Sequence, residues 1–165
     1  MKTSVSMKVV IALMAGLALA GCSKKNTPDL EANTGSVGQA APGSEQDFST
    51  NVGDRIYFEN DQTALTAEGE ETLRRQAAWL EKYPDVMIQV EGHADERGTR
   101  EYNISLSARR ATVTREFLIA QGVKAKRISS IAYGKERPVA SCDAEQCWSQ
   151  NRRAVTVITG GAKTS

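Results

Sequence analysis

The chain has 165 residues, with 21 lysines and arginines against 20 aspartates and glutamates, and a formal charge of +1. A chain this close to neutral lacks the basic excess of a general nucleic-acid-binding protein, so that class is excluded. A single histidine also excludes a zinc site built from several histidines.

The first residues are typical of a secretory signal. Lys2 and Lys8 precede the apolar run Val9–Ala20, which is too short to span a bilayer comfortably. The run ends in Leu-Ala-Gly-Cys, which resembles the lipobox of bacterial lipoproteins. The resemblance implies cleavage before Cys22, a diacylglycerol and an acyl chain on that cysteine, and an outer-membrane anchor with the domain in the periplasm. An ordinary signal peptide followed by an unrelated cysteine is the alternative.

The next stretch has the composition of a flexible linker. Residues 23–47 are rich in Gly, Ser, Pro, Ala, Asn and Gln and have no hydrophobic periodicity. We therefore predict a cleaved signal peptide at 1–21, the lipidated cysteine and linker at 22–47, and a folded domain at 48–165. Cleavage removes both lysines of the signal, which changes the formal charge from +1 to −1.

The first half of the domain predicts two strands around a helix. Arg55–Glu59 is β-branched and aromatic, as strands are. Thr66 is placed to cap a helix at Ala67–Lys82, which ends before Pro84. Val86–Val90 alternates, which predicts a strand with one face covered by helices and the other less buried.

The second half predicts a helix and two strands. The helix is expected from Leu106 to Gln121, because Gly122 is a good C-terminal signal. Strands are expected at Ile128–Tyr133 and Ala154–Thr159, with a loop between them. The order β-α-β-α-β-β predicts an α/β fold of the α+β-like sandwich kind, with a mixed sheet and two main helices on one face.

A charged residue lies on the apolar stripe of the second predicted helix. On a helical wheel, Arg110 falls within about 40° of Leu106 and near the helix start. The stripe is completed by Val113, Phe117 and Ala120. A buried arginine needs an anionic partner, and Asp95 follows the preceding strand at the edge where this helix begins. Either these two residues pair with each other, or Asp95 binds the ammonium and Arg110 the carboxylate of one amino-acid-like ligand.

Four motifs resemble a known family. They are EGHADERGTREYN at 91–103, LSARRA at 106–111, AYGKE at 132–136 and NRRAV at 151–155. In this order, over about Asp54–Thr159, the chain resembles the OmpA-like peptidoglycan-binding domain family. The resemblance implies the OmpA C-terminal fold and noncovalent binding of peptidoglycan through its meso-diaminopimelate side chain. With the lipid anchor, it also implies a tether between outer membrane and cell wall, in the Tol system that serves cell division and envelope integrity.

The same resemblance assigns roles to individual residues. Asp95 corresponds to the ammonium-binding acid and Arg110 to the carboxylate-binding arginine. Pocket walls and supporting contacts are expected from Tyr57, Phe58, Asn60, His93, Ala94, Thr99, Asn103, Leu106 and Arg153. Ala94 departs from the family, in which many members have Thr, and we expect the loss of one hydroxyl contact at most.

Catalysis is a competing class of function. His93 lies beside Asp95 and Glu96, which are acid–base groups, but His93 and Asp95 are two positions apart in an extended segment and need not touch. The sequence has neither G-x-S-x-G nor H-E-x-x-H. We therefore expect no catalytic residue, no metal site and no cofactor.

Cys142 and Cys147 are the two cysteines that remain once Cys22 is lipidated. An oxidising periplasm favours a disulfide between them, and closing so short a ring contributes about 2 kcal/mol in the chain-entropy model. A redox or metal site is the alternative.

A protein-interaction module is the other competing class. The family resemblance implies a second partner, the periplasmic propeller protein of the Tol system (TolB-like), bound near the peptidoglycan pocket. The loop residues that could contribute are Arg97, Arg100, Glu101 and Tyr102. The alternative is that they form solvated surface.

Overall fold

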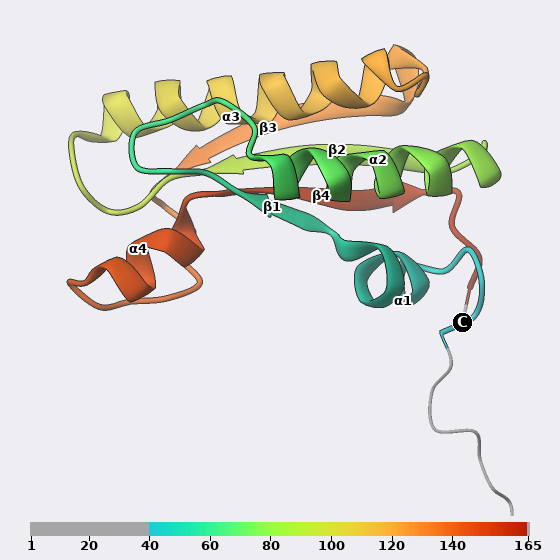
Figure 1. Ribbon diagram of the computed structural model, residues 1–165, viewed down its shortest axis with the longest axis horizontal. Helices are drawn as coiled ribbons and strands as arrows, with labels where there is room; N and C mark the ends of the chain where they lie inside the picture. The colour runs from blue at the N-terminus through green and yellow to red at the C-terminus, as the bar shows by residue number, and fades with distance from the viewer. Residues whose placement is uncertain (1–39, 165) are drawn as a thin grey trace, which may run out of the picture. The chain divides into compact units, whose positions relative to one another are not determined.

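The structure is a computed structural model that describes residues 40–164 (Figure 1). The predicted signal peptide, Cys22 and the predicted linker up to residue 39 lie outside the described residues. The described elements are α1 (Glu45–Asp47), η1 (Phe48–Gly53), β1 (Arg55–Tyr57), α2 (Ala67–Lys82), β2 (Met87–His93), α3 (Arg100–Ala120), η2 (Ala125–Arg127), β3 (Ile128–Gly134), α4 (Glu145–Asn151) and β4 (Arg153–Gly160). Within this part of the chain, no helix combines the length and apolar character needed to cross a membrane.

The four strands form one mixed sheet in the order β1-β4-β2-β3. β2 pairs in parallel with β3, and β4 runs antiparallel to both β1 and β2. The core forms where α2 and α3 meet the sheet face that carries Ile88 and Val90, both 1 % exposed or less. The opposite face is more open, with Met87 41 % exposed. The predicted fold class, a mixed sheet with two main helices on one face, is confirmed.

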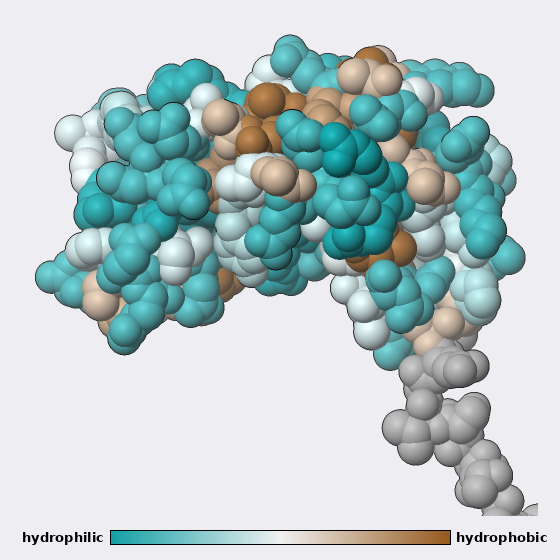
Figure 2. Space-filling view, in the orientation of Figure 1, coloured by the Kyte–Doolittle hydropathy of each residue, from teal (hydrophilic) through white to brown (hydrophobic). Residues whose placement is uncertain are grey.

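The space-filling view supports this division between core and surface. On the face shown in Figure 2, hydrophilic residues predominate, and hydrophobic residues show through only in small patches near α2 and α3. Val113 and Phe117 are among the partly buried residues that pack against the core. On this face, apolar residues are therefore largely covered.

The polar segment between β2 and α3 is shorter than predicted. β2 continues to His93 instead of ending at Val90, because Glu91 and Gly92 pair with both β3 and β4. α3 begins at Arg100 instead of Leu106, capped by the Thr99 hydroxyl, which accepts the Tyr102 N–H at 3.2 Å. Only residues 94–99 connect the two elements. Elsewhere, β1 stops at Tyr57 and the predicted loop before the last strand contains α4.

The buried face of α3 is rotated from the predicted stripe. Arg110 is fully buried, at 0 % exposed, and Leu106 is buried as predicted. Val113 and Phe117 are only partly buried and Ala120 is exposed. Small polar and apolar residues take their place against the sheet, namely Ser107, Ala111, Thr114 and Leu118.

One glycine allows α3 to approach the sheet. A Cβ atom on Gly92 would lie 1.9 Å from the Ser107 carbonyl oxygen, well inside van der Waals contact. At the same level, the Gly134 N–H donates to the Ser107 hydroxyl at 2.9 Å, which joins α3 to the end of β3. Helix and sheet are therefore in closest contact immediately before the segment 94–99.

The end of the predicted linker belongs to the folded domain. Ser44 is fully buried and caps α1, and Asp47 accepts a hydrogen bond from the Trp79 indole at 2.9 Å. The Gly43 carbonyl accepts the Lys163 N–H at 3.0 Å. The packed region therefore starts before residue 48, the predicted boundary.

Candidate functional site

Three segments surround a hollow of about 320 Å³ at the edge where β2 ends and α3 begins. They are the turn after β1, the segment 94–99 and the first turns of α3. The lining residues are Asn60, Asp61, Asp95, Arg97, Gly98, Tyr102, Asn103 and Leu106. Four of the predicted site residues, Asp95, Asn60, Asn103 and Leu106, are thus brought together, as the sequence indicated.

Asp95 is the most strongly contacted residue of this hollow. Its side chain is only 9 % exposed and forms ion pairs with Arg97 at 2.7 Å and with Arg152 at 3.5 Å. The Arg97 backbone N–H also donates to it, at 3.2 Å. Burial alone would raise the pKa of Asp95, but the hydrogen bonds and charges of Arg97 and Arg152 outweigh it and hold this pKa below its ordinary value. Asp95 is therefore an ionised acceptor at neutral pH.

Arg110 lies behind the hollow and is held by the backbone. Its guanidinium donates to the carbonyl oxygens of Gln62 at 3.0 Å, His93 at 3.0 Å and Glu59 at 3.3 Å. A guanidinium has more N–H groups than these contacts use, but Arg110 is 0 % exposed and is not among the residues that line the hollow. Burial lowers the pKa of Arg110 to about 10, which leaves it charged at neutral pH.

Two expectations about Arg110 change. Among the described residues, Asp95 forms its ion pairs with Arg97 and Arg152 and not with Arg110, so the simple structural pair of Asp95 and Arg110 is absent. Arg110 also lies well inside α3, because the helix starts at Arg100. The argument from the positive helix N-terminus, whose effect falls off within the first turn, therefore does not apply to it.

Sequence reasoning missed several residues of this region: Asp61 and Gly98, which line the hollow, Arg97 and Tyr102, which were expected only at a protein contact, and Arg152, which lies next to it. Arg152 is 3 % exposed, contacts Asp95, donates to the Phe58 carbonyl at 3.1 Å and pairs with Glu145. The predicted residue, Arg153, is also buried but donates to the carbonyls of Arg137 and Asn151 instead. Neighbouring residues of an extended chain point in opposite directions, so only one arginine of the pair can face Asp95. Nothing in the sequence indicates which one.

The remaining predicted residues lie around the hollow without lining it. Thr99 caps α3, and Ala94 is buried, with its N–H bonded to the Gly134 carbonyl at 2.8 Å. Phe58 is buried, and its ring centroid lies 5.1 Å from the guanidinium carbon of Arg110. Tyr57 lines a neighbouring hollow of about 590 Å³, which also reaches Arg152.

His93 is a packed residue in this structure. It is 2 % exposed, its ring lies 5.4 Å from that of Tyr133, and neither ring nitrogen has a hydrogen-bond partner. Burial, with the charges of Arg153 and Arg137, lowers the pKa of His93 to about 4. Its contribution to the site is the backbone carbonyl that holds Arg110.

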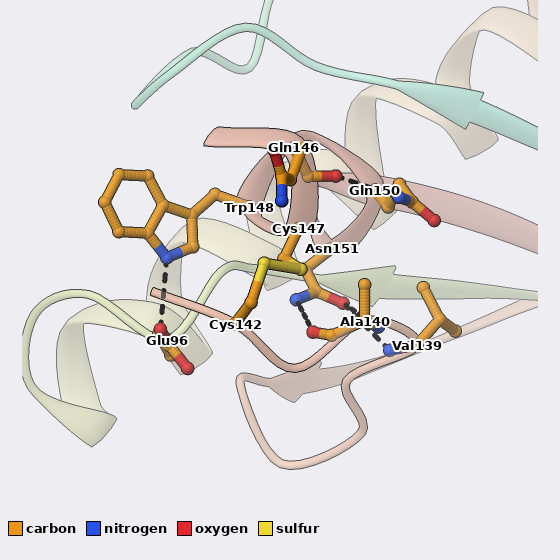
Figure 3. The surroundings of a disulfide bond; sticks show 9 residues. All are labelled: Glu96, Val139, Ala140, Cys142, Gln146, Cys147, Trp148, Gln150 and Asn151. Carbon is orange, nitrogen blue, oxygen red and sulfur yellow. Dashed lines mark hydrogen bonds between the residues drawn. A yellow bond between two sulfur atoms is a disulfide. The ribbon is translucent and has the colours of Figure 1, made fainter. Parts of the chain in front are cut away.

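The short helix α4 lines the neighbouring hollow of about 590 Å³, through Glu145, Ser149 and Gln150. Cys142 and Cys147 form a disulfide at its start, as predicted, and Asn151 ties its end to the backbone of Val139 and Ala140 (Figure 3). Trp148 projects from α4 toward the segment 94–99, where its indole N–H donates to Glu96 at 3.1 Å (Figure 3). The sequence predicts a loop here with no role at the site, whereas the structure has a helix.

The fold is that of the OmpA family. The model of that family matches residues 57–152, which include every residue that lines the 320 Å³ hollow, and the chain belongs to this family. The resemblance inferred from the sequence is confirmed.

The named relatives are peptidoglycan-associated lipoproteins. The one from Agrobacterium fabrum (strain C58 / ATCC 33970) is 60 % identical over 154 residues, which cover 92 % of this chain and 87 % of the relative. The one from Rhizobium meliloti (strain 1021) is 58 % identical over 162 residues, which cover 97 % and 92 % of the two chains.

Solved structures with a similar fold include another peptidoglycan-associated lipoprotein. The crystal structure of the peptidoglycan-associated lipoprotein from Burkholderia pseudomallei superposes with a TM-score of 0.66 at 32 % identity, covering 70 % of this chain and all 100 % of that chain. The C-terminal domain of Helicobacter pylori MotB gives a TM-score of 0.61 at 28 % identity, covering 65 % and 84 %.

Proposed function

We propose that this domain binds peptidoglycan noncovalently, through the ammonium and carboxylate groups of a meso-diaminopimelate side chain. The observation that carries the proposal is the hollow lined by an ionised carboxylate, Asp95, and by Arg97, with the buried cations Arg152, paired with Asp95, and Arg110 behind them. Groups of both signs at one small site suit a zwitterion better than a simple anion or cation. The names of the relatives support peptidoglycan as the source of that zwitterion.

The contacts assign a role to each group. Asp95 accepts the ammonium, and Arg110 donates N–H groups that its three backbone contacts leave over. Asn103, whose amide donates to the Arg97 carbonyl at 2.7 Å, holds the segment 94–99 against α3. Leu106 supplies an apolar wall for the methylene chain of the ligand. Binding and release are the whole of the proposed chemistry, and no residue is given a catalytic role.

Together with the proposed lipid anchor at Cys22, this binding connects two layers of the cell envelope. A chain held in the outer membrane at one end and bound to peptidoglycan at the other is a tether between the two layers. We place the tether in the Tol-Pal envelope system, with roles in cell division and envelope integrity and with the Tol propeller as a second partner. Exposed residues at the rim favour a nearby protein contact, since Tyr102 is 43 % exposed and the Arg100 side chain 68 % exposed.

The test is a binding assay with the full chain in detergent micelles and purified peptidoglycan, with free meso-diaminopimelate as competitor. Asp95→Asn removes the negative charge that would bind the ammonium. Arg110→Lys keeps a positive charge but loses the planar guanidinium and its parallel N–H donors. Arg115→Lys is the matched control, because Arg115 lies on the same helix, donates to the Ile128 carbonyl at 3.1 Å and does not line the hollow.

We expect the wild type and Arg115→Lys to sediment with peptidoglycan and to be released by the competitor. Asp95→Asn and Arg110→Lys should lose most of this binding while their circular dichroism spectra remain those of the wild type. If both folded variants bind as well as the control, the proposed pocket is wrong. For the propeller, undiminished binding of both partners at once would show that their sites do not overlap.

A further inference from the structure

The disulfide between Cys142 and Cys147 holds the start of a helix that is too short to be stable by itself. α4 has seven residues, and its N-cap residue, Ala144, makes no side-chain capping bond; isolated helices shorter than about 12–15 residues are marginal in water. Cys147 lies in the first turn of α4 and Cys142 in the loop before it, so the bond ties that turn to the loop (Figure 3). The other end of α4 is held separately, because the Asn151 amide donates to the Ala140 carbonyl at 2.7 Å. The first turns of α4 therefore depend on the disulfide.

One side chain of these turns contacts the segment 94–99. The Trp148 indole N–H donates to Glu96 at 3.1 Å, and the Trp148 ring centroid lies 4.2 Å from the Arg97 guanidinium carbon (Figure 3). Both partners of Trp148 lie in the segment that also carries Asp95. A ligand that binds a segment already restrained by such contacts loses less conformational entropy than one that must order it. The position of α4 therefore affects how strongly the segment binds.

A second side chain of these turns acts on Asp95 through a buried arginine. Arg152 forms ion pairs with Glu145, in the first turn of α4, and with Asp95 at 3.5 Å. While Glu145 is in place, the Arg152 cation is shared between two carboxylates. If Glu145 moves away, Asp95 is left to neutralise Arg152 alone, because a buried charge without a partner is costly. An incoming ammonium group then competes with Arg152 for Asp95.

We propose that the disulfide between Cys142 and Cys147 is a redox switch for the peptidoglycan site, in which the oxidised chain binds and reduction weakens binding by releasing the first turns of α4. In the reduced chain the segment 94–99 loses its contact with Trp148, and Asp95 is held more tightly by Arg152. Both changes act in the same direction. This inference rests on the proposed function and adds regulation to it.

The switch needs a reductant that can reach the bond, and both cysteines are partly exposed. One thiolate of a dithiol reductant attacks a sulfur of the disulfide and forms a mixed disulfide, while the other cysteine leaves as a thiolate and takes up a proton. The second thiol of the reductant then displaces the remaining cysteine. The reductant ends as a disulfide and the protein as two thiols, so two electrons and two protons have moved. A disulfide oxidant reverses both steps.

Two readouts separate the movement of α4 from its effect on binding. The first is the quenching of tryptophan fluorescence by iodide. Of the two tryptophans, Trp79 is only 7 % exposed, so quenching reports mainly on Trp148. The second is the dissociation constant for purified peptidoglycan, measured by sedimentation with the full chain in detergent micelles. Both are measured on the oxidised protein, after reduction with dithiothreitol and after reoxidation.

Three variants accompany the wild type. The double variant Cys142→Ser, Cys147→Ser lacks the bond under all conditions and shows any direct effect of dithiothreitol. Glu96→Ala removes the acceptor of the Trp148 indole but leaves the disulfide intact. Asp47→Ala is the matched control, because it removes the acceptor of the other tryptophan, at 2.9 Å, in α1 at the opposite end of the domain from α4 (Figure 1).

We expect reduction of the wild type to increase quenching and to weaken binding by about fivefold, the equivalent of one hydrogen bond. Reoxidation should restore both values. Asp47→Ala should respond as the wild type does. Oxidised Glu96→Ala should already bind more weakly, and its reduction should change binding by less than in the wild type. The double serine variant should bind like the reduced wild type and should not respond to dithiothreitol.

Other outcomes overturn the inference in distinguishable ways. If two free thiols appear and neither readout changes, α4 does not depend on the disulfide. If quenching rises but binding stays the same, α4 is released without acting on the site; in both cases the proposed function stands. If circular dichroism shows that reduction unfolds the whole domain, the bond is a general stabiliser and not a switch. If the oxidised wild type does not bind peptidoglycan, the proposed function fails and the inference fails with it.

Discussion

The close approach of α3 to β2 makes Gly92 highly sensitive to substitution. In Gly92→Ala the new Cβ would lie 1.9 Å from the Ser107 carbonyl oxygen, and the Ala111 methyl lies only 3.2 Å from the same position. The first atom belongs to the backbone, so a side-chain rotation cannot relieve the overlap. The helix must move away from the sheet by more than 1 Å, judged against ordinary contact distances of about 3.5–4.0 Å.

The expected cost follows from what this movement breaks. Overpacking of a core site costs about 1–3 kcal/mol. The hydrogen bond from the Gly134 N–H to the Ser107 hydroxyl, now 2.9 Å, stretches with the helix and adds about 1 kcal/mol. We therefore expect Gly92→Ala to lower the free energy of unfolding by about 2–4 kcal/mol. Asn103 and Leu106 move with α3, so binding to peptidoglycan should weaken as well.

Urea denaturation followed by circular dichroism tests this expectation. With an m-value of about 2 kcal/mol per M, the midpoint should fall by about 1–2 M. Gly160→Ala is the matched control, because Gly160 lies near the end of β4 and a Cβ atom there meets nothing within 4 Å. The control should stay within about 0.5 kcal/mol of the wild type. Equal stability of the two variants would show that helix and sheet are not in this close contact.

Three further predictions concern the pH dependence, the disulfide and a helix cap. Because the pKa of His93 is lowered to about 4, the unfolded chain binds a proton between pH 6.5 and 4 that the folded chain does not; stability should fall by about 3 kcal/mol as pH falls through this window. Urea midpoints across the window should be nearly level for His93→Gln, and an equally steep decline in that variant would assign the effect to other groups. Replacing both Cys142 and Cys147 by Ser should cost about 2 kcal/mol in the same assay, and an unchanged midpoint would mean that the loop they close is already restricted without the bond. Thr66 accepts the Gly69 N–H at 3.0 Å, so Thr66→Ala should lower the thermal midpoint by an amount equivalent to about 1 kcal/mol while Thr66→Ser leaves it nearly unchanged, and similar losses in both variants would contradict the capping role.

The three arginines near Asp95 differ in the groups that they contact. Arg110 and Arg152 join segments that are distant in the chain, because their guanidinium groups bind carbonyls of the turn after β1 and of β2. These contacts hold the segments around the pocket in place. The Arg97 side chain is more exposed and pairs instead with the side chains of Asp95 and Asn60.

Signals that are local in the chain predicted their elements well. The bounds of α2 were predicted to the residue, because the Thr66 cap and the break before Pro84 both lie next to the helix. The last residue of β2 and the first residue of α3 were not predicted correctly. Glu91–His93 looks like a polar loop, but backbone pairing with β3 and β4 keeps it in the sheet. Similarly, the polar residues at 100–105 hid the first turns of α3, which the Thr99 cap begins.

For the site, too, motifs that are local in the chain were predictive, whereas contacts between distant segments were not predicted. The motifs of the sequence were sufficient for the family and the mixed fold, and Asp95, one of the predicted site residues, lines the hollow. Only the tertiary structure decided that Arg152 and not Arg153 reaches Asp95, and that backbone carbonyls hold Arg110 while side chains hold Arg97. The reason is physical: a guanidinium is fixed or mobile according to the carbonyls around it, and here those carbonyls come from segments that only folding brings together.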